Sequence, residues 1–515
     1  MAVKLFASVV IGSTETEMKV YEISPRKGFH MIDCVNRRID LGVDAYERGS
    51  LSTEKLERLV ETLNEYHKIM DGLHVDGYRM VGTSALREIR TGLIVKDLIE
   101  RRTGLELTIL SNSEQRFLDY KSIASLTESF EQVIKKGTAI VDIGGSSLQI
   151  SMFDKDKLIT TQNVRIGKIA SRSKFYPLAK NNEHFESLLQ ELLDHELNGF
   201  EKLYQKDRKI STLIATNKEL HALFHTLYPD RKGMTVTREE FESAYEQIVH
   251  MNAEEITKNY SIPFEYALAV VPSAITCRAL LHRFESDGVW LPAVSISDGL
   301  AYDYAVANKA VNSQHSFDED IIAASRSIAK RYKSNQPHIR NVEENSLAIF
   351  DKMKKFHQLG RRERLLLQIS AILHNCGKYI SLTDVADCAY NILMATEIIG
   401  LNHAERQIVA NVVRFNTAEF SYYDDLALIS SVSREEYIVI AKLTAILRAA
   451  NALDRSHHQR IKDLNVSVKN DKLILGVSSD EDLTLERGTL EEKDSLFEEV
   501  YNLKPVLRQT RQIRK

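Results

Sequence analysis

Two segments of this chain repeat one pattern: an apolar strand, a turn rich in glycine and hydroxyl residues, and a second strand. The first segment reads FASVVIGSTETEMKVYEI, and the second reads TAIVDIGGSSLQISMFD. The glycines that open the two turns stand at positions 12 and 144 of 515, which is 132 residues apart. This spacing is too long for a solenoid, whose repeats span roughly 20–50 residues. The pattern therefore predicts an internal duplication, in which two lobes each carry one hairpin.

The segments between the two hairpins alternate between strand and helix signals. Residues 3–45 have the short apolar runs that are typical of strands, whereas residues 53–71 place apolar side chains at helical spacing. YRMVGTSALRE and ELTILSNSEQRFLDYKSIASL each lead from a strand into a helix. This alternation indicates an α/β architecture.

The sequence changes character after VNSQHSFDED, a polar segment with the composition of a linker. Long helical segments follow it, and IKDLNVSVKNDKLILGVSSDEDLTLER then alternates as strands do. The last eight residues, RQTRQIRK, form a basic tail that we expect to be solvated. The sequence thus predicts four parts: a first lobe over 1–125, a second lobe over 126–311, an all-helical domain over 312–460, and a small strand-and-helix portion over 461–515.

The amino-acid composition limits the classes of partner that the chain can bind and the cellular compartment that suits it. The chain has 68 Lys and Arg against 72 Asp and Glu, a formal net charge of −4, which excludes a globally basic nucleic-acid-binding protein. Its four cysteines form no CxxC pair, and they fit buried thiols in a reducing compartment better than a disulfide framework. No stretch approaches the ~20 consecutive apolar residues of a membrane span. We therefore expect a cytoplasmic protein with no membrane segment and no specific nucleic-acid partner.

Both glycine turns have the composition of phosphate-binding loops. Glycine lets the backbone approach a ligand, and successive N–H groups can then point at phosphate oxygens. For one copy, a hairpin turn with a capping aspartate is an equally good interpretation. Two copies favour a cleft that closes on a phosphate chain, with Asp142 placed to hold Mg²⁺ directly or through water. The candidate phosphate-binding residues are Gly12, Ser13 and Thr14 in the first turn and Gly144, Gly145, Ser146 and Ser147 in the second.

A further candidate anion site lies in GTSALRE, where Arg87 follows Thr83 and Ser84 at a predicted strand-to-helix junction. Hydroxyl groups, a helix N-terminus and a guanidinium together form a cradle for an oxyanion. Without further context, Ser84 as a helix N-cap beside a solvated Arg87 is about as good an interpretation.

Five segments in order, VVIGSTET, GTSALRE, LSNSEQRFL, VDIGGSSLQI and SISDGLAYDY, resemble the motifs of the exopolyphosphatase/guanosine-pentaphosphate phosphohydrolase (Ppx/GppA) family. LTAILRAANALDRSHHQRIKDLNV is similar to part of the HD-like domain of its longer members. The resemblance implies a two-lobed actin-like ATPase (ribonuclease H-like) fold, followed by an all-α HD-like domain and a small α+β portion. It also implies a homodimer that uses Mg²⁺ and acts on polyphosphate or on guanosine tetra- or pentaphosphate.

The same resemblance locates the departures of this chain from the family's motifs. It places Gln115 and Gln149 at the positions of two catalytic glutamates, and Val10 at the position of the first aspartate. A glutamine cannot take a proton from water, and losing a general base typically lowers a rate by about 10²–10⁴. Gln115 and Gln149 can then at most position the attacking water, and Asp142 remains as the catalytic and metal-binding carboxylate.

Three other carboxylates are candidate substitutes in the metal site. They are Glu15, Glu114 and Asp298, and Glu15 is our choice of second metal ligand. Glu114 is expected to face away from the cleft if its neighbour Gln115 faces into it. The segment IATNKEL at 214–220 also lacks the glycine that the family has there.

The helical domain lacks most of the metal ligands that an HD phosphohydrolase needs. The resemblance places His374-Asn375 at the His-Asp pair, Asn451 at the distant aspartate, and Asn345 or Ser346 near the first histidine. One ligand of about four is too few for a metal site. We therefore expect no metal in this domain and a packing role for His374.

Two further pairs of residues near this motif have weak signals. Cys376 and Cys388 are close to His374 in sequence, but their spacing is not that of a zinc site. His457-His458 has the context of a surface turn.

The sequence leaves two main hypotheses open. One is a phosphohydrolase that releases terminal phosphate from polyphosphate or guanosine pentaphosphate, weakened because both catalytic glutamate positions hold glutamine. The other is an inactive pseudo-phosphatase that binds polyphosphate or a phosphorylated nucleotide as a sensor. A general nucleotide-binding actin-like protein fits the motif order less well, and a purely structural role is the fourth interpretation.

Overall fold

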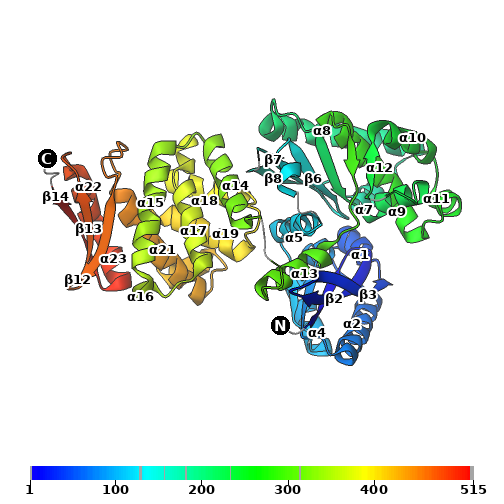
Figure 1. Cartoon of the computed structure of the whole chain (residues 1–515), viewed down its shortest axis with the longest axis horizontal. Helices are drawn as coiled ribbons and strands as arrows, with labels where there is room; N and C mark the ends of the chain where they lie inside the picture. The colour runs from blue at the N-terminus through cyan, green and yellow to red at the C-terminus, as the bar shows by residue number, and fades with distance from the viewer. Residues whose placement is uncertain are drawn as a thin grey trace. The chain divides into compact units, whose positions relative to one another are not determined.

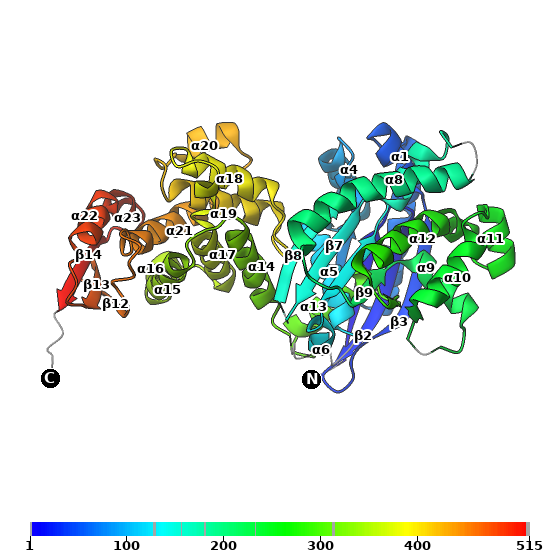
Figure 2. The ribbon, with the colours of Figure 1, turned by 90° about the horizontal axis from the view of Figure 1, so that it is seen from above.

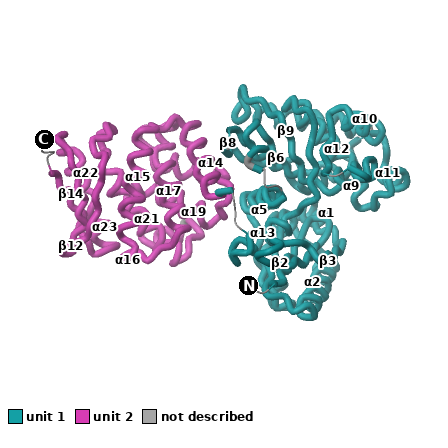
Figure 3. Tube along the Cα trace, viewed as in Figure 1, with its two compact units in different colours: residues 1–316 teal, residues 317–515 magenta. Residues whose placement is uncertain are grey.

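The computed structural model describes residues 3–126, 130–155, 157–179, 182–231, 233–311 and 315–510. The chain divides into two compact units, Met1–Ser316 and Phe317–Lys515 (Figure 3). The predicted linker VNSQHSFDED spans their junction, but residues 312–314 lie outside the described residues, as do residues 511–515 of the basic tail. The division into four parts stays a prediction.

The first unit contains two sheets, and the first has the strand order β3-β2-β1-β4-β5 (Figure 1). Its first three strands pair antiparallel, and β4 and β5 continue the sheet in parallel with β1. The strands are β1 (Lys4–Ile11), β2 (Glu15–Ser24), β3 (Gly28–Arg38), β4 (Gly77–Gly82) and β5 (Leu107–Ile109).

The second sheet has the order β10-β11-β9-β6-β7-β8, which repeats the arrangement of the first with one added edge strand. Three antiparallel strands, β6, β7 and β8, are followed by β9 and β11, which run parallel to β6. The strands are β6 (Thr138–Ile143), β7 (Leu148–Asp154), β8 (Lys157–Val164), β9 (Thr212–Thr216), β10 (Thr235–Thr237) and β11 (Gly288–Trp290). The predicted duplication of the hairpins is therefore present in the sheet topology.

The two turns also close in the same way. The N–H of Gly12 donates to the carbonyl of Glu15 at 2.9 Å, and the N–H of Gly144 donates to the carbonyl of Ser147 at 3.0 Å. A Cβ atom at Gly12 would lie 2.8 Å from the carbonyl oxygen of Glu15, so this turn requires glycine.

Helices cover both sheets of the first unit (Figures 1 and 2). The helix over 53–71 is confirmed and continues to Leu73, whereas the prediction of strands up to residue 45 is wrong at its end. Asp40 has a left-handed φ of 56° and the chain turns there into helix α1, which buries Leu41 and Ala45. The helices are α1 (Leu41–Arg48), α2 (Thr53–Leu73), α3 (Ser84–Arg87), α4 (Gly92–Thr103), α5 (Asn112–Ala124), α6 (Phe130–Ile134), α7 (Lys168–Phe175), α8 (Asn182–Phe200), α9 (Lys218–Leu227), α10 (Arg238–Ile248), α11 (Ala253–Tyr260), α12 (Phe264–Phe284) and α13 (Ile296–Ala307), with a π-helical turn at Glu201–Gln205.

Helices α5 and α13 lie side by side against one face of the first sheet (Figures 1 and 2). Leu118 of α5 and Leu300 of α13 share a buried apolar cluster with Phe6, Val10 and Tyr21 of that sheet. Although α13 follows the second lobe in sequence, it therefore packs on the first. This packing fixes α5, which carries Gln115, against the sheet that ends in the first glycine turn.

Helix α12 is long and apolar enough, by length and composition alone, to cross a membrane, contrary to our expectation that no stretch would be. Two thirds of its most apolar window is buried, 67%, and its residues Val270, Ile275 and Leu280 lie in the core of the second lobe. The apolar composition is accounted for by this central position.

The second unit is helical over most of its length and ends in a three-stranded sheet of order β12-β13-β14. Its elements are α14 (Phe317–Arg331), α15 (Gln336–Lys352), α16 (Lys354–His357), α17 (Arg361–Leu373), a 3₁₀ turn (Cys376–Tyr379), α18 (Val385–Ala395), α19 (His403–Phe415), α20 (Tyr423–Ile429), α21 (Arg434–Ala452), β12 (Leu464–Lys469), β13 (Lys472–Ser478), α22 (Thr484–Glu492), α23 (Asp494–Tyr501) and β14 (Lys504–Thr510). The predicted change from helices to strands is thus found at residue 464.

Candidate active site

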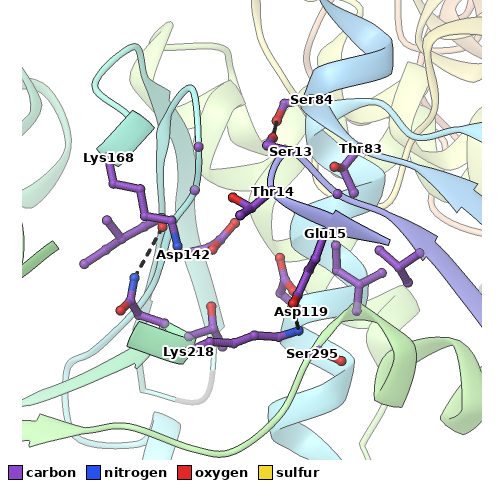
Figure 4. A pocket seen from close by; sticks show the side chains of 18 of the residues that line it. Ser13, Thr14, Glu15, Thr83, Ser84, Asp119, Asp142, Lys168, Lys218 and Ser295 are labelled. Carbon is purple, nitrogen blue, oxygen red and sulfur yellow. Dashed lines mark hydrogen bonds and ion pairs between the residues drawn. The ribbon is translucent and has the colours of Figure 1, made fainter. Parts of the chain in front are cut away.

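The two glycine turns face each other across a cavity of about 190 Å³ in the first unit (Figure 4). The loops that follow β4 and β9 and the first turns of α5, α7 and α9 complete its wall. It is lined by Val10, Gly12, Ser13, Thr14, Glu15, Glu17, Thr83, Ser84, Gln115, Asp119, Asp142, Ile143, Gly144, Gly145, Lys168, Ile169, Thr216, Asn217, Lys218, Glu219, Tyr266, Val294, Ser295 and Ile296.

Most of the residues predicted from the sequence meet at this cavity, and four do not. The residues that line it are Gly12, Ser13, Thr14, Glu15, Ser84, Gln115, Asp142, Gly144 and Gly145. Those outside the lining are Arg87, Ser146, Ser147 and Gln149. Their roles in binding and catalysis stay predictions.

The two turns approach each other closely at Ser13 and Gly145. A Cβ atom at Gly145 would lie 2.9 Å from Ser13 Oγ and 3.0 Å from the hydroxyl of Tyr46, so the second turn needs a glycine at this position. Ser13 Oγ is hydrogen-bonded to the Tyr46 hydroxyl and, at 3.1 Å, to Ser84 Oγ. Ser146, which is not part of the cavity lining, donates to Glu88 Oε1 at 2.5 Å. The hydrogen bond from Ser146 to Glu88 therefore joins the second turn to the first lobe.

Arg87 is half-buried and is not part of the cavity lining. Its Nη1 donates to the carbonyl of Leu110 at 2.7 Å and to Gln115 Oε1 at 3.4 Å. The prediction of Ser84 as a helix N-cap is wrong, because Thr83 is the cap residue of α3 and Ser84 is its first helical residue. Arg87 thus contacts Gln115, and its predicted contact with a phosphate oxygen stays a prediction.

Gln115 faces Asp142, as its predicted position requires. Because Arg87 donates to its carbonyl oxygen, its amide nitrogen is free to donate to Asp142 Oδ2, at 3.3 Å. Gln149 lies opposite Asp142 in the pairing of β6 with β7 and is only 3% exposed. Its Oε1 has no hydrogen-bond partner within the described part of the chain. The two glutamines therefore differ: one reaches the cavity and the other is buried beside it.

The substitute carboxylates predicted for the metal site are already engaged. Glu114 caps α5 by accepting from the N–H and hydroxyl of Ser111, so it faces away from the cavity as predicted. Asp298 accepts from Lys19 and Tyr21 and is not part of the lining.

Lys218, at the start of α9, holds the two acidic residues of the first hairpin. Its Nζ lies 2.7 Å from Glu15 Oε1 and 2.7 Å from Glu17 Oε2. Glu15 also accepts from the Tyr266 hydroxyl at 3.3 Å. Burial raises the pKa of Glu17, but the charges of Lys218 and Lys19 outweigh it and lower that pKa to about 2. Glu17 is therefore ionised at neutral pH, and Lys218 pairs with both glutamates.

A second ion pair lines the opposite wall, where Lys168 Nζ lies 2.6 Å from Glu219 Oε2. Beside it, burial raises the pKa of Asp142 to about 6, although the charge of Lys168 and the hydrogen bond from Gln115 act in the other direction. Burial and the negative charge of Asp142 also raise the pKa of Asp119 well above its usual range. Burial in this cavity thus disfavours the ionised forms of Asp119 and Asp142, which a nearby positive charge would favour.

Sequence reasoning missed five charged residues of this cavity: Glu17, Asp119, Lys168, Lys218 and Glu219. For two of these positions the sequence contains a usable signal. Asp119 follows Gln115 by four residues on a predicted helix, and this spacing puts both on one face. Lys218 lies in IATNKEL, where a strand ends and a helix begins as in GTSALRE.

The second unit contains a buried histidine cluster that the sequence did not predict. His338 Nδ1 lies 2.8 Å from Asp454 Oδ2, and His338 Nε2 lies 3.1 Å from His374 Nε2. His457, predicted in a surface turn, is half-buried and stacks on His338 with ring centroids 3.6 Å apart. His374 thus packs inside helices, as predicted, and also hydrogen-bonds to a second histidine. Among the described residues, no three His, Cys, Asp or Glu side chains are grouped so that they could hold a metal ion.

Protein-family models match most of the first unit and most of the second unit. The Ppx/GppA phosphatase family matches residues 19–307, and domain III of the Ppx/GppA phosphatases matches residues 322–499. A Photobacterium profundum protein named guanosine-5'-triphosphate,3'-diphosphate pyrophosphatase is 18% identical over 477 residues, covering 92% of this chain and 91% of its own. A protein of the same name from Aliivibrio fischeri is 20% identical over 482 residues, covering 92% and 91%.

Two solved structures show the same fold over 60–61% of the chain. An exopolyphosphatase from Cytophaga hutchinsonii has a TM-score of 0.54 at 16% identity, and covers 60% of this chain and 100% of its own. The Aquifex aeolicus member of the Ppx/GppA family has a TM-score of 0.51 at 18% identity, and covers 61% and 100%. The predicted α/β fold and the predicted family are both confirmed, and this chain belongs to the Ppx/GppA phosphatase family.

Proposed function

We propose that this protein is a phosphohydrolase that releases terminal phosphate from polyphosphate or from guanosine pentaphosphate, at a low rate. The observation that supports this proposal is the meeting of two glycine turns at one cavity that also contains Asp142 and Gln115. The relatives named above as pyrophosphatases of guanosine-5'-triphosphate,3'-diphosphate cover nearly the whole chain, which favours the same class of substrate.

The cavity offers the groups that a phosphate chain needs. The two turns line one space, and each turn is closed by the N–H of its own glycine. The hydroxyls of Ser13, Thr14, Thr83 and Ser84 line one wall, and Lys168 lines the other (Figure 4). Gln115 holds its amide at Asp142, where it can orient a water molecule for attack on the terminal phosphorus.

A divalent cation fits part of this site. The donor atoms are carboxylate oxygens, and none of the described residues that line the cavity is a His or Cys, which is the chemistry that Mg²⁺ prefers. Asp142 would hold the ion; Glu15 does not fit as a second ligand, because Lys218 and Tyr266 already occupy its carboxylate. When bound, Mg²⁺ neutralises negative charge on the phosphate oxygens.

We propose a low rate because Gln115 and Gln149 cannot accept the proton of the attacking water. The same two residues, together with Val10 in the cavity wall, favour the second candidate function, a sensor that binds these ligands without hydrolysing them. We further propose that α14–α21 correspond to the HD-like domain without a metal ion, and that the protein is a cytoplasmic homodimer. Its four cysteines are all unpaired, which suits a reducing compartment.

Phosphate release and ligand binding measured together test this proposal. Long-chain polyphosphate and guanosine pentaphosphate are each incubated with the full chain and Mg²⁺, then Mn²⁺, and titrated by calorimetry in parallel. We expect micromolar binding and release that is above background but slow. Binding without release would support the sensor, and a rate on the order of 1–10³ s⁻¹, that of ordinary enzymes, would contradict the weak hydrolase.

A further inference from the structure

We propose that Asp119 and Asp142 together form a two-carboxylate site for Mg²⁺, in which Asp119 supplies the acidic ligand that Gln115 and Gln149 no longer provide. This inference rests on the proposed function in one respect, the choice of Mg²⁺ as the cation. The glutamines remove two carboxylates from the predicted metal site, and Asp119 introduces one from the next turn of the same helix, α5.

The ion pairs around the cavity indicate that Asp119 and Asp142 are the carboxylates available to a cation. Five carboxylates line it: Glu15, Glu17, Asp119, Asp142 and Glu219. Lys218 forms ion pairs with both glutamates of the first hairpin, and Lys168 forms one with Glu219. No ion pair involves Asp119 or Asp142 among those found within the described residues. The two aspartates are thus the carboxylates that remain for a cation.

Asp119 is positioned to ligate rather than to support the helix. It is 6% exposed, and its Oδ2 has no hydrogen-bond partner within the part of the chain that the structure describes. A buried carboxylate oxygen without a partner is costly, because it has lost water and gained nothing in exchange. Asp119 and Asp142 both line the cavity (Figure 4). The negative charge of Asp142 contributes to the raised pKa of Asp119, and the positive charge of Arg116 partly offsets it.

Two carboxylates are what Mg²⁺ commonly takes from a protein. Mg²⁺ keeps several waters and is usually held by one or two carboxylates together with phosphate oxygens of a substrate, rather than by a full protein cage. The cavity fits this arrangement, since it has room for waters beside the glycine turns. The absence of three grouped metal-binding side chains among the described residues argues against a site for zinc, which takes three or four protein ligands.

Metal binding by the full chain, without any phosphate substrate, tests the site. Calorimetric titration with Mg²⁺, and Mn²⁺ titration followed by electron paramagnetic resonance, give the affinity of the wild type, Asp119→Asn and Asp142→Asn. We expect each substitution to weaken binding at least about tenfold, since even residues behind a ligand cost about 10–100-fold. Asp97→Asn is the matched control, because Asp97 lies on α4 with a side chain that is 61% exposed and outside the cavity.

The melting temperature, measured in EDTA and then in Mg²⁺, gives a second test of the site. In EDTA, Asp119→Asn should raise the melting temperature, because it replaces a buried carboxyl oxygen that has no hydrogen-bond partner among the described residues. Added Mg²⁺ should raise the melting temperature of the wild type and raise that of the variant less. Asp119→Ser, which is smaller and cannot overfill the cavity, is the second variant if Asp119→Asn does not fold.

Three results would overturn the inference: a wild type that binds neither ion, an Asp119→Asn variant that binds them as the wild type does, or a variant that loses stability in EDTA with an unchanged response to Mg²⁺. These results are separable from failure of the proposed function. Ion binding through Asp119 without phosphate release would keep the site and refute hydrolysis. Phosphate release that Asp119→Asn leaves unchanged would keep hydrolysis and refute the site.

Discussion

Lys218 Nζ lies 2.7 Å from Glu17 Oε2 and joins two parts of the first unit that are 201 residues apart in sequence. Glu17 lies on β2 of the first sheet, with a side chain that is 6% exposed, whereas Lys218 opens α9 beside the second sheet and is 39% exposed. Ser295 and Ser297 donate to the other carboxylate oxygen of Glu17. This network closes one side of the cavity and ties the two lobes together.

Replacing Lys218 by methionine should destabilise the first unit. It leaves the buried charge of Glu17 with weaker compensation, and losing one partner of a fully buried pair costs about 3–5 kcal/mol. Because Lys218 is partly exposed, we expect a smaller loss of about 1–3 kcal/mol. The chain has one tryptophan, Trp290 on β11, so its fluorescence in urea follows the first unit specifically. The double variant Lys218→Met/Glu17→Gln should recover most of the loss, and no recovery would contradict the pairing.

The depressed pKa of Glu17 predicts how the first unit responds to acid. Its pKa falls from 4.5 to about 2 in the folded protein, so the folded state holds the carboxylate ionised while the unfolded state takes up a proton. The stabilisation is complete above pH 4.5 and is lost as the pH falls from about 4.5 towards 2. Glu17→Gln should flatten this part of the pH profile of Trp290-detected unfolding. An unchanged slope in the variant would show that other groups carry it.

The different places of Gln115 and Gln149 predict unequal effects on activity. Gln115→Glu puts a carboxylate in the cavity beside Asp142, whereas Gln149→Glu puts one at a position that is 3% exposed and outside the lining. We expect Gln115→Glu to raise Mg²⁺-dependent phosphate release by about 10²-fold, the low end of what a general base contributes. Gln149→Glu should raise it less and should destabilise the fold, because it buries a charge. Initial rates on polyphosphate, with melting temperatures beside them, decide between the two positions. A larger gain from Gln149→Glu would contradict this ranking.

The close approach of the two glycine turns predicts that ligand binding depends on Gly145. In Gly145→Ala, the added methyl group would lie 2.9 Å from Ser13 Oγ and 3.0 Å from the Tyr46 hydroxyl, which would push the turns apart. We expect a cost of about 1–3 kcal/mol in stability, as for other overpacked sites, and weaker binding of polyphosphate by calorimetry. Gly72→Ala is the control, because nothing lies within 4 Å of a Cβ atom there, at the exposed end of α2. It should keep the affinity of the wild type.

The sequence was sufficient to predict the fold and the glycine turns that line the cavity, but not the ion pairs around it. Gly12 and Gly144 identified both turns because each turn depends on local backbone geometry, which one short segment encodes. The ion pairs of Lys218 with Glu15 and of Lys168 with Glu219 depend on the packing of α9 and α7, which no local pattern specifies. The same difference explains Arg87: a strand-to-helix junction was visible in GTSALRE, but its hydrogen bond to the carbonyl of Leu110 was not.

The first and second hairpins also carry their acidic residues on opposite strands, which the aligned motifs alone did not reveal. Val10 pairs with Glu17 in the first hairpin, and Asp142 pairs with Gln149 in the second. At equivalent positions the acid is therefore on the second strand of one hairpin and on the first strand of the other. The loss of an aspartate at Val10 does not leave the first hairpin without a carboxylate, although Glu17 is held by Lys218.

The buried histidines of the second unit predict a separate sensitivity to acid. His374 Nδ1 lies 2.7 Å from the carbonyl of Ala371, and a carbonyl only accepts, so Nδ1 carries the proton and Nε2 accepts from His338. Burial lowers the pKa of His374 from 6.5 to about 3, and the charge of His338 acts in the same direction.

The folded second unit therefore excludes a proton that the unfolded chain binds. The stabilisation that depends on neutral His374 is fully present above pH 6.5. As the pH is lowered from 6.5 towards about 3, the free energy of unfolding falls by about 1.4 kcal/mol per pH unit because of this one group. His374→Asn, which does not titrate in this range, should lower that slope by the same amount. Far-UV circular dichroism in urea follows the helices of both units, whereas Trp290 fluorescence reports the first unit alone and should show the same profile in both proteins. A slope that His374→Asn leaves unchanged would assign the acid sensitivity to His457, whose pKa burial also lowers, to about 4.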